Sequence, residues 1–259
     1  MLRICHLYPE LLNLHGDRGN VIAIKQRCAW RGIEADVCEV KIGETFEPEQ
    51  ADILYLGGGS DRAQALIATD IAARRAALSR AVEDGLVVLA ICGGYRMLGK
   101  YYSTDQGQKI PGLALIDIYT EPGKTRFAGN CLVEMKIGEQ KVRVAGFENH
   151  AERTYLGPNV RPLGRVLHGH GNNGEDKTEG ARYKNVFGSY LHGPLLPKNS
   201  YLTDLLIELA LRRRAAKKKS DPKKETEPGL EEHLPLAPLD DTLETAAVQV
   251  MTKRLLKKK

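Results

Sequence analysis

One stretch near the middle of the chain constrains the fold most. Residues 86–91 are all apolar, and Cys92, Gly93 and Gly94 follow them directly. Such a run predicts a strand of a parallel sheet, because helices cover this kind of strand on both faces. An abrupt turn of small residues between a strand and a helix is typical of a nucleophile elbow. The stretch therefore predicts a largely parallel sheet with a reactive Cys92 above its edge. The alternative is a buried cysteine before a tightly packed helix.

The flanking segments alternate between strand and helix patterns, which predicts an α/β fold with a mostly parallel sheet flanked by helices. An antiparallel extension is expected after residue 111, built on a hairpin of residues 130–137 and 141–146. Strands are expected at 2–8, 33–40, 52–56, 86–91 and 185–191, and helices at 21–28, 61–84, 95–102 and from residue 200.

Charge is unevenly distributed along the 259 residues. Residues 212–259 hold 13 Lys or Arg and 8 Asp or Glu, and this excess accounts for the net charge of +5. We therefore expect a folded domain over residues 1–214 and a charged, disordered tail over 215–259. A short basic amphipathic helix from residue 240, touching a membrane surface or a partner, is the alternative for the end of the tail. A neutral folded body gives no reason to expect a nucleic-acid partner.

Several function classes lack their sequence signatures. The five cysteines form no C-x-x-C pair, so we expect no disulfide framework and no metal site. No G-x-x-x-x-G-K-[ST] motif is present, so ATP is not expected to bind this chain. No apolar run approaches the ~20 residues of a membrane span, and the first residues do not form a signal peptide. We expect a cytoplasmic protein.

A base and an oxyanion hole are predicted near Cys92. His192 follows the strand predicted at 185–191, so it is expected at the same sheet edge as Cys92. Backbone N–H groups of Gly58 and Gly59, in the glycine turn after residue 56, and of Gly93 are expected to form an oxyanion hole. The alternatives are a strand-end histidine satisfied by the backbone and an ordinary tight turn.

Five segments carry a resemblance to a known family. LGGGSDRAQ, AICGGYRMLG, TRFAGN, GFENHAERT and FGSYLHGPLLPKN occur in this order. They resemble glutamine amidotransferases of the CobB/CobQ, or cobyric acid synthase, type, and most of all the GatD-type glutaminase subunits of lipid II isoglutaminyl synthases. The likeness covers roughly residues 1–211 and implies the class I glutamine amidotransferase fold, a flavodoxin-like three-layer arrangement.

The resemblance implies a role for each matching residue. Cys92 would be the nucleophile, His192 the general base, and Arg126 the group that binds the α-carboxylate of L-glutamine. Some relatives carry a carboxylate two residues after the histidine, where this chain has Pro194. This difference favours a Cys–His dyad, with Glu148 as the candidate that orients His192.

The resemblance also implies a partner. In the family, ammonia passes to a MurT-like subunit of the Mur-ligase type, which uses ATP and Mg²⁺ to amidate the D-glutamate of the lipid II stem peptide. No cofactor is then expected on this chain, and the reaction would take place at the inner face of the membrane. The alternatives are an amidotransferase for another acceptor such as a cobyrinic-acid-like carboxylate, a cysteine hydrolase unrelated to glutamine, and a non-catalytic regulatory module. Intact Cys92, His192 and Arg126 disfavour the last of these.

Overall fold

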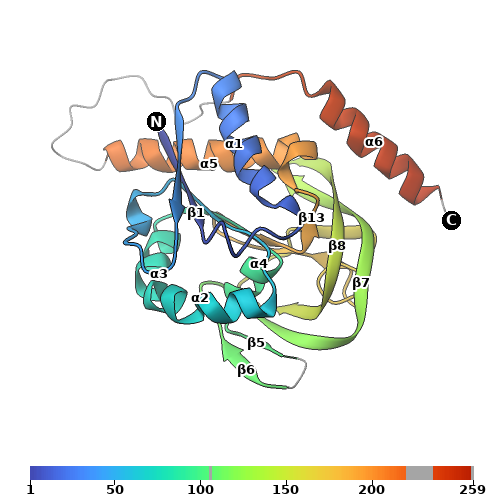
Figure 1. The fold of residues 1–259 in the computed structure, drawn as a ribbon. Helices are drawn as coiled ribbons and strands as arrows, with labels where there is room; N and C mark the ends of the chain where they lie inside the picture. The colour runs from blue at the N-terminus through green and yellow to red at the C-terminus, as the bar shows by residue number, and fades with distance from the viewer. Residues whose placement is uncertain (105–106, 220–235, 258–259) are drawn as a thin grey trace.

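Two sheets meet in this protein, and helices cover the first sheet on both faces (Figure 1). The computed structural model describes residues 1–104, 107–219 and 236–257. Neighbouring strands of the first sheet are parallel except for the edge pair β11–β12, which confirms the predicted α/β class. Its strands in spatial order are β11 (Ala181–Tyr183), β12 (Val186–Ser189), β4 (Val87–Ile91), β3 (Ile53–Leu56), β1 (Leu2–Leu7) and β2 (Ala35–Val40).

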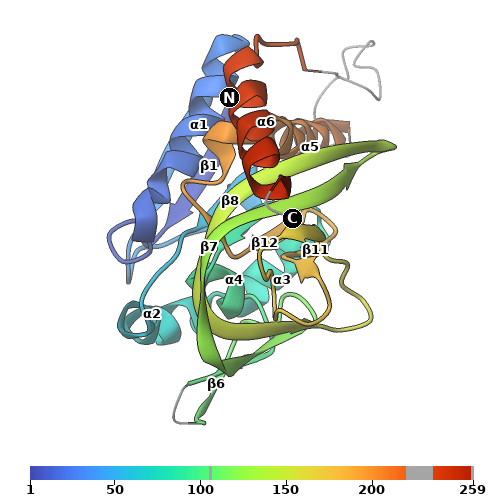
Figure 2. The same cartoon turned by 90° about the vertical axis from the view of Figure 1, so that its right-hand side faces the viewer.

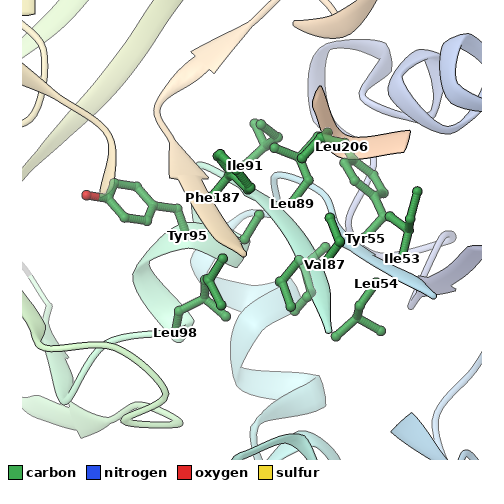
Figure 3. Close-up of a cluster of buried hydrophobic side chains, with 14 of the residues drawn as sticks. Ile53, Leu54, Tyr55, Val87, Leu89, Ile91, Tyr95, Leu98, Phe187 and Leu206 are labelled. Carbon is green, nitrogen blue, oxygen red and sulfur yellow. The ribbon is translucent and has the colours of Figure 1, made fainter. Parts of the chain in front are cut away.

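The helices pack on the first sheet through apolar side chains. α1 (Arg18–Trp30) and α5 (Ser200–Lys219) lie on one face, and α2 (Asp61–Ala73) and α3 (Arg75–Glu83) lie on the other. Figure 3 shows side chains of β3 and β4 packed with Leu206 of α5 and with Tyr95. All five residues of β4 are buried, as the apolar run predicts. The predicted helix over 61–84 is divided in two at Arg74.

The helix predicted over 95–102 is wrong beyond residue 97. The observed helix α4 (Gly93–Met97) ends early, and β5 (Tyr101–Ser103) follows it and pairs with β6 (Lys109–Pro111) and β7. At Gly99 a Cβ would lie 2.7 Å from Cγ1 of Ile118. This close approach of β7 and the strand pairing of β5 override the local helical propensity.

The second sheet is built on the predicted hairpin, which is confirmed and is longer than expected. β7 (Ile118–Ile137) and β8 (Gln140–Leu156) pair antiparallel along most of their length, with a register shift between Pro122 and Phe127. Gly138, at the turn, has a φ of 58°, which glycine adopts without strain. The two long strands curve along one side of the molecule (Figure 2). The remaining strands are β9 (Gly164–His168), β10 (Thr178–Glu179) and β13 (Leu191–His192).

The strand predicted at 185–191 passes from one sheet to the other. β12 ends at Ser189 in the first sheet, and Leu191 and His192 pair with β8 in the second. Between them, the N–H of Tyr190 donates to the buried carboxylate of Glu179 at 2.8 Å. The prediction of one continuous strand is therefore wrong, because a buried acceptor stabilises the crossing at Tyr190.

The C-terminal segment departs from the predicted tail. α5 continues past residue 214 to Lys219, and α6 (Thr242–Leu256) is a helix, so the prediction of disorder is wrong there. Leu255 of α6 packs on Leu132 and Ala145 of the second sheet, while the Asp241 carboxylate binds Arg27 of α1 at 2.6 Å. Residues 220–235 lie outside the described residues. Within the described ranges, we find no helix with the length and hydropathy needed to cross a bilayer.

Candidate active site

Cys92 lies in a sharp turn between β4 and α4. Its φ of 48° and ψ of −103° are a strained combination for a residue with a side chain. Both following glycines are needed for space: a Cβ at Gly93 would lie 2.9 Å from the backbone of Gly59, and one at Gly94 would lie 2.8 Å from the Leu56 carbonyl oxygen. The turn therefore has the geometry of the predicted nucleophile elbow.

A buried arginine follows Cys92 by about one helical turn. Arg96 is 4% exposed, and its guanidinium binds the carboxylates of Asp61 and Glu152. These carboxylates and the nearby Cys92 raise the pKa of Arg96 against the opposing effect of burial. A permanent positive charge is thus held within electrostatic reach of the Cys92 sulfur.

His192 reaches Cys92 from the other sheet. A Cβ placed on Gly58 would lie 2.9 Å from Cε1 of His192 and 3.6 Å from Cβ of Cys92, so both side chains border the same small volume. His192 is 1% exposed. Nε2 of its ring has no hydrogen-bond acceptor among the described residues and is available to the sulfur. The structure therefore brings the two predicted catalytic residues together.

Asp17 orients His192, a role that no sequence pattern predicted. The Nδ1–H of His192 donates to Oδ1 of Asp17 at 3.1 Å, and the Asp17 carboxylate is fully buried. Asp17 comes immediately before α1, where the positive end of the helix dipole favours a carboxylate. The only sequence signal for this residue was its place in the segment between the first strand and the first helix, at the carboxyl edge of the sheet.

The prediction that Glu148 orients His192 is wrong. The Glu148 carboxylate accepts the backbone N–H groups of His170 and Gly171, both at 2.9 Å, and Nδ1–H of His170 at 2.7 Å. Glu148 pairs with Leu191 in the sheet, whereas His192 pairs with Phe147. Because neighbouring strand residues face opposite ways, the carboxylate points to the 168–171 loop.

His192 is protonated at neutral pH in this setting. Burial lowers its pKa, but the hydrogen bond with Asp17 and the neighbouring Cys92 outweigh burial and raise the pKa from 6.5 to about 10. An imidazolium beside a cysteine stabilises the thiolate by charge. The pair is thereby prepared for nucleophilic attack.

The oxyanion-hole prediction requires one correction. The N–H of Gly58 donates to Oδ2 of Asp17 at 2.8 Å, so the buried carboxylate already occupies this donor. The N–H groups of Gly59 and Gly93 have no acceptor in the described part of the chain. Their use as the two oxyanion donors stays a prediction, now without Gly58.

Arg126 lies on β7 at the register shift between Pro122 and Phe127, with its side chain exposed. Its Nη1 donates to Oδ1 of Asn149 on β8 at 3.0 Å. Asn149 in turn contacts His15, whose ring packs against His192. The predicted carboxylate-binding residue is thus connected to the catalytic pair by three contacts.

Gly58 is expected to tolerate no side chain. In Gly58→Ala, the added methyl group would meet Cε1 of His192 and Oδ2 of Asp17 at 2.9 Å each. For the glutamine hydrolysis that the resemblance implies, we expect the rate to fall by at least about 100-fold, the usual cost of misplacing a reacting group by about 1 Å. Ammonia release measures this. Gly129→Ala is the control, because its added Cβ would meet no atom of the described part of the chain within 4 Å. Normal turnover in Gly58→Ala would contradict the arrangement.

Comparison with known proteins agrees with this geometry. Residues 3–200 match the CobB/CobQ-like glutamine amidotransferase domain. The chain is 44% identical over 213 residues to the lipid II isoglutaminyl synthase subunit GatD of Staphylococcus aureus (82% of this chain, 86% of that protein). It is 39% identical to the corresponding subunit of Streptococcus pneumoniae, over 82% of each chain.

More distant relatives share parts of the chain or the fold alone. Cobyric acid synthase of Pelotomaculum thermopropionicum is 33% identical over 60% of this chain, which is 31% of that protein. Among solved structures, the glutaminase domain of Trypanosoma brucei CTPS has a TM-score of 0.52 at 11% identity, over 82% of this chain and 94% of that one. The similarity to the first two relatives and the family match agree, and this chain belongs to the CobB/CobQ-like glutamine amidotransferase family.

Proposed function

We propose that this chain is the glutaminase subunit of a lipid II isoglutaminyl synthase. The observation that carries the proposal is the buried Cys92–His192–Asp17 arrangement, in a chain similar over four-fifths of its length to two such subunits. The chain hydrolyses L-glutamine and passes ammonia to an ATP-dependent subunit of the Mur-ligase type. That subunit binds ATP and Mg²⁺ and amidates the D-glutamate of the lipid II stem peptide to D-isoglutamine. The reaction takes place in the cytoplasm, at the membrane face that carries lipid II.

Hydrolysis proceeds through a thioester. The Cys92 thiolate attacks the side-chain amide carbon of glutamine, and the carbonyl oxygen becomes an oxyanion that Gly59 and Gly93 stabilise through their N–H groups. Each such donor contributes about 3 kcal/mol. Nε2–H of the His192 imidazolium gives its proton to the amide nitrogen, the C–N bond breaks, and ammonia leaves.

Deacylation uses the same groups, but His192 now accepts a proton instead of donating one. Neutral His192 takes a proton from a water molecule, and the resulting hydroxide attacks the thioester carbon. The carbon–sulfur bond then breaks, glutamate leaves, and Cys92 returns as a thiolate beside the imidazolium. The Asp17 carboxylate stays ionised and stabilises the imidazolium in both half-reactions.

The acceptor is tested with the complete complex. We expect the chain, copurified with its ATP-dependent subunit, to form D-isoglutamine on lipid II when ATP and glutamine are both supplied. Ammonium chloride in place of glutamine is expected to support the same product, because it bypasses the glutaminase. Mass spectrometry of the muropeptide measures the product, a change of one mass unit for each carboxyl group amidated. A complex that amidates a cobyrinic-acid-type carboxylate and leaves lipid II unchanged would overturn this acceptor.

A further inference from the structure

The turn before Asp17 makes a second contact with the active site, through His15. The short 3₁₀ helix η1 (Leu14–Gly16) precedes Asp17, and the ring of its His15 packs edge-on against His192, with the centroids 4.6 Å apart and the planes at 63°. The turn is tied to the active-site glycines, because the N–H of Leu14 donates to the Gly58 carbonyl at 3.0 Å. His15 has a φ of 56°, a conformation that residues with side chains rarely adopt.

Asn149 joins this turn to Arg126. Its Oδ1 accepts a hydrogen bond from Nη1 of Arg126 at 3.0 Å, which places its Nδ2 towards Nε2 of His15 at 3.3 Å. Nδ2 is a donor, so Nε2 of His15 is the acceptor in this contact. The amide of Asn149 thus has one defined orientation, with a separate partner at each end.

Arg126 keeps its charge available for a ligand. No acidic side chain in the described ranges pairs with it, and its hydrogen bonds there go to the side chain and the backbone oxygen of Asn149. The side chain is exposed, and an exposed arginine without a neighbour samples many rotamers. The hydrogen bond to Asn149 restricts that sampling, and the His15 contact restricts Asn149 in turn.

We infer that His15 and Asn149 are positioning residues that hold Arg126 at a fixed reach from Cys92 and thereby select glutamine over asparagine. The inference rests on the proposed function. Arg126 would hold the α-carboxylate of the substrate while Cys92 attacks its amide carbon. The distance between Arg126 and Cys92 then determines which length of substrate side chain can react. Asparagine is one methylene shorter than glutamine. Its amide carbon therefore does not reach the Cys92 sulfur when Arg126 is held in place. A mobile Arg126 removes this restriction.

The test compares glutamine and asparagine in the complex of this chain with its ATP-dependent subunit. For Asn149→Ala, we expect the KM for glutamine to rise about 10-fold, kcat to change less than about 3-fold, and the preference in kcat/KM for glutamine over asparagine to fall at least about 10-fold. Asn159→Ala is the matched control, because Asn159 is exposed and its side chain has no hydrogen bond to any residue that the structure describes. Ammonia release measures both substrates.

His15 variants separate positioning from proton transfer. His15→Ala is expected to weaken glutamine binding as Asn149→Ala does, whereas His15→Gln keeps an acceptor for Asn149 and is expected to restore the KM to within about 3-fold of the wild type. Labelling by iodoacetamide, which needs no α-carboxylate, is expected to stay unchanged in Asn149→Ala, while labelling by a glutamine-mimicking diazo-ketone slows down. The difference between the two labelling rates distinguishes loss of carboxylate binding by Arg126 from loss of folding.

The outcomes are distinct. An active wild-type complex with unchanged KM and unchanged amide preference in Asn149→Ala would overturn the positioning role alone. His15→Gln as impaired as His15→Ala would remove His15 from that role. A wild-type complex that releases no ammonia from glutamine would overturn the proposed function and the inference together.

Discussion

Replacing Cys92 by alanine is expected to abolish glutamine-dependent amidation, with a loss of at least about 10⁴-fold, because no thioester forms without the sulfur. Synthesis supported by ammonium chloride is expected to continue in the same complex, since the ATP-dependent subunit is unchanged. The rates of D-isoglutamine formation with each nitrogen source measure the two effects. Loss of the glutamine-dependent rate with a retained ammonium-dependent rate shows that one chemical step is lost and that the complex stays assembled.

The control for Cys92→Ala is another cysteine. Cys38 lies on β2, is partly exposed and takes no part in the site. Cys38→Ala is expected to keep its glutaminase rate and its labelling by a glutamine-mimicking diazo-ketone, whereas Cys92→Ala is expected to lose both. An unchanged adduct mass in Cys92→Ala would refute the nucleophile assignment.

The second large effect is expected at Asp17. Asp17→Asn keeps the size of the side chain but removes the charge that holds His192 protonated and correctly oriented. We expect kcat/KM for glutamine to fall by at least about 10²-fold, because neutralising the carboxylate of a serine-protease triad lowers kcat by about 10⁴-fold. Glu148→Gln is the comparison, because the Glu148 carboxylate binds the 168–171 loop, and we expect its rate to stay within about 5-fold of the wild type. Equal losses in the two variants would contradict the assignment of Asp17.

The pH profile of Asp17→Asn follows from the same contact. The wild-type His192 pKa is raised to about 10, so the imidazolium persists through neutral pH and is lost as the pH rises through about 10. Without the Asp17 charge the lowering effect of burial remains, and the pKa falls. The alkaline limb of kcat/KM is therefore expected to move to lower pH in the variant. A limb that does not move would mean that Asp17 does not stabilise the charged ring.

Local patterns predicted the parts of the site that depend on neighbours in sequence. The elbow at Cys92 follows from an apolar strand and two glycines, and both are visible within ten residues. The hairpin of β7 and β8 follows from alternation and a glycine turn, although its full length does not. The helix expected at 95–102 failed because pairing with a distant strand decides the structure there.

Asp17 shows what a single sequence does not predict. Asp17 and His192 are 175 residues apart, and no spacing rule connects the turn after β1 to a residue of β13. Glu148 lies near His150 in one of the motifs that carry the family resemblance, which made it the candidate. Its side chain nevertheless points away from His192. Which carboxylate reaches a histidine depends on the facing of strands in the assembled sheets, and one residue of register reverses that facing.

The crossing at Tyr190 means that the two halves of the reaction centre have different supports. The sulfur follows a strand of one layer, while the imidazole is fixed to the long hairpin of the other. A relative displacement of the layers by about 1 Å would separate them enough to lower turnover roughly 100-fold, with every reacting group intact. The packing between the two sheets therefore fixes the distance between the sulfur and the imidazole, and the reaction rate depends on that packing.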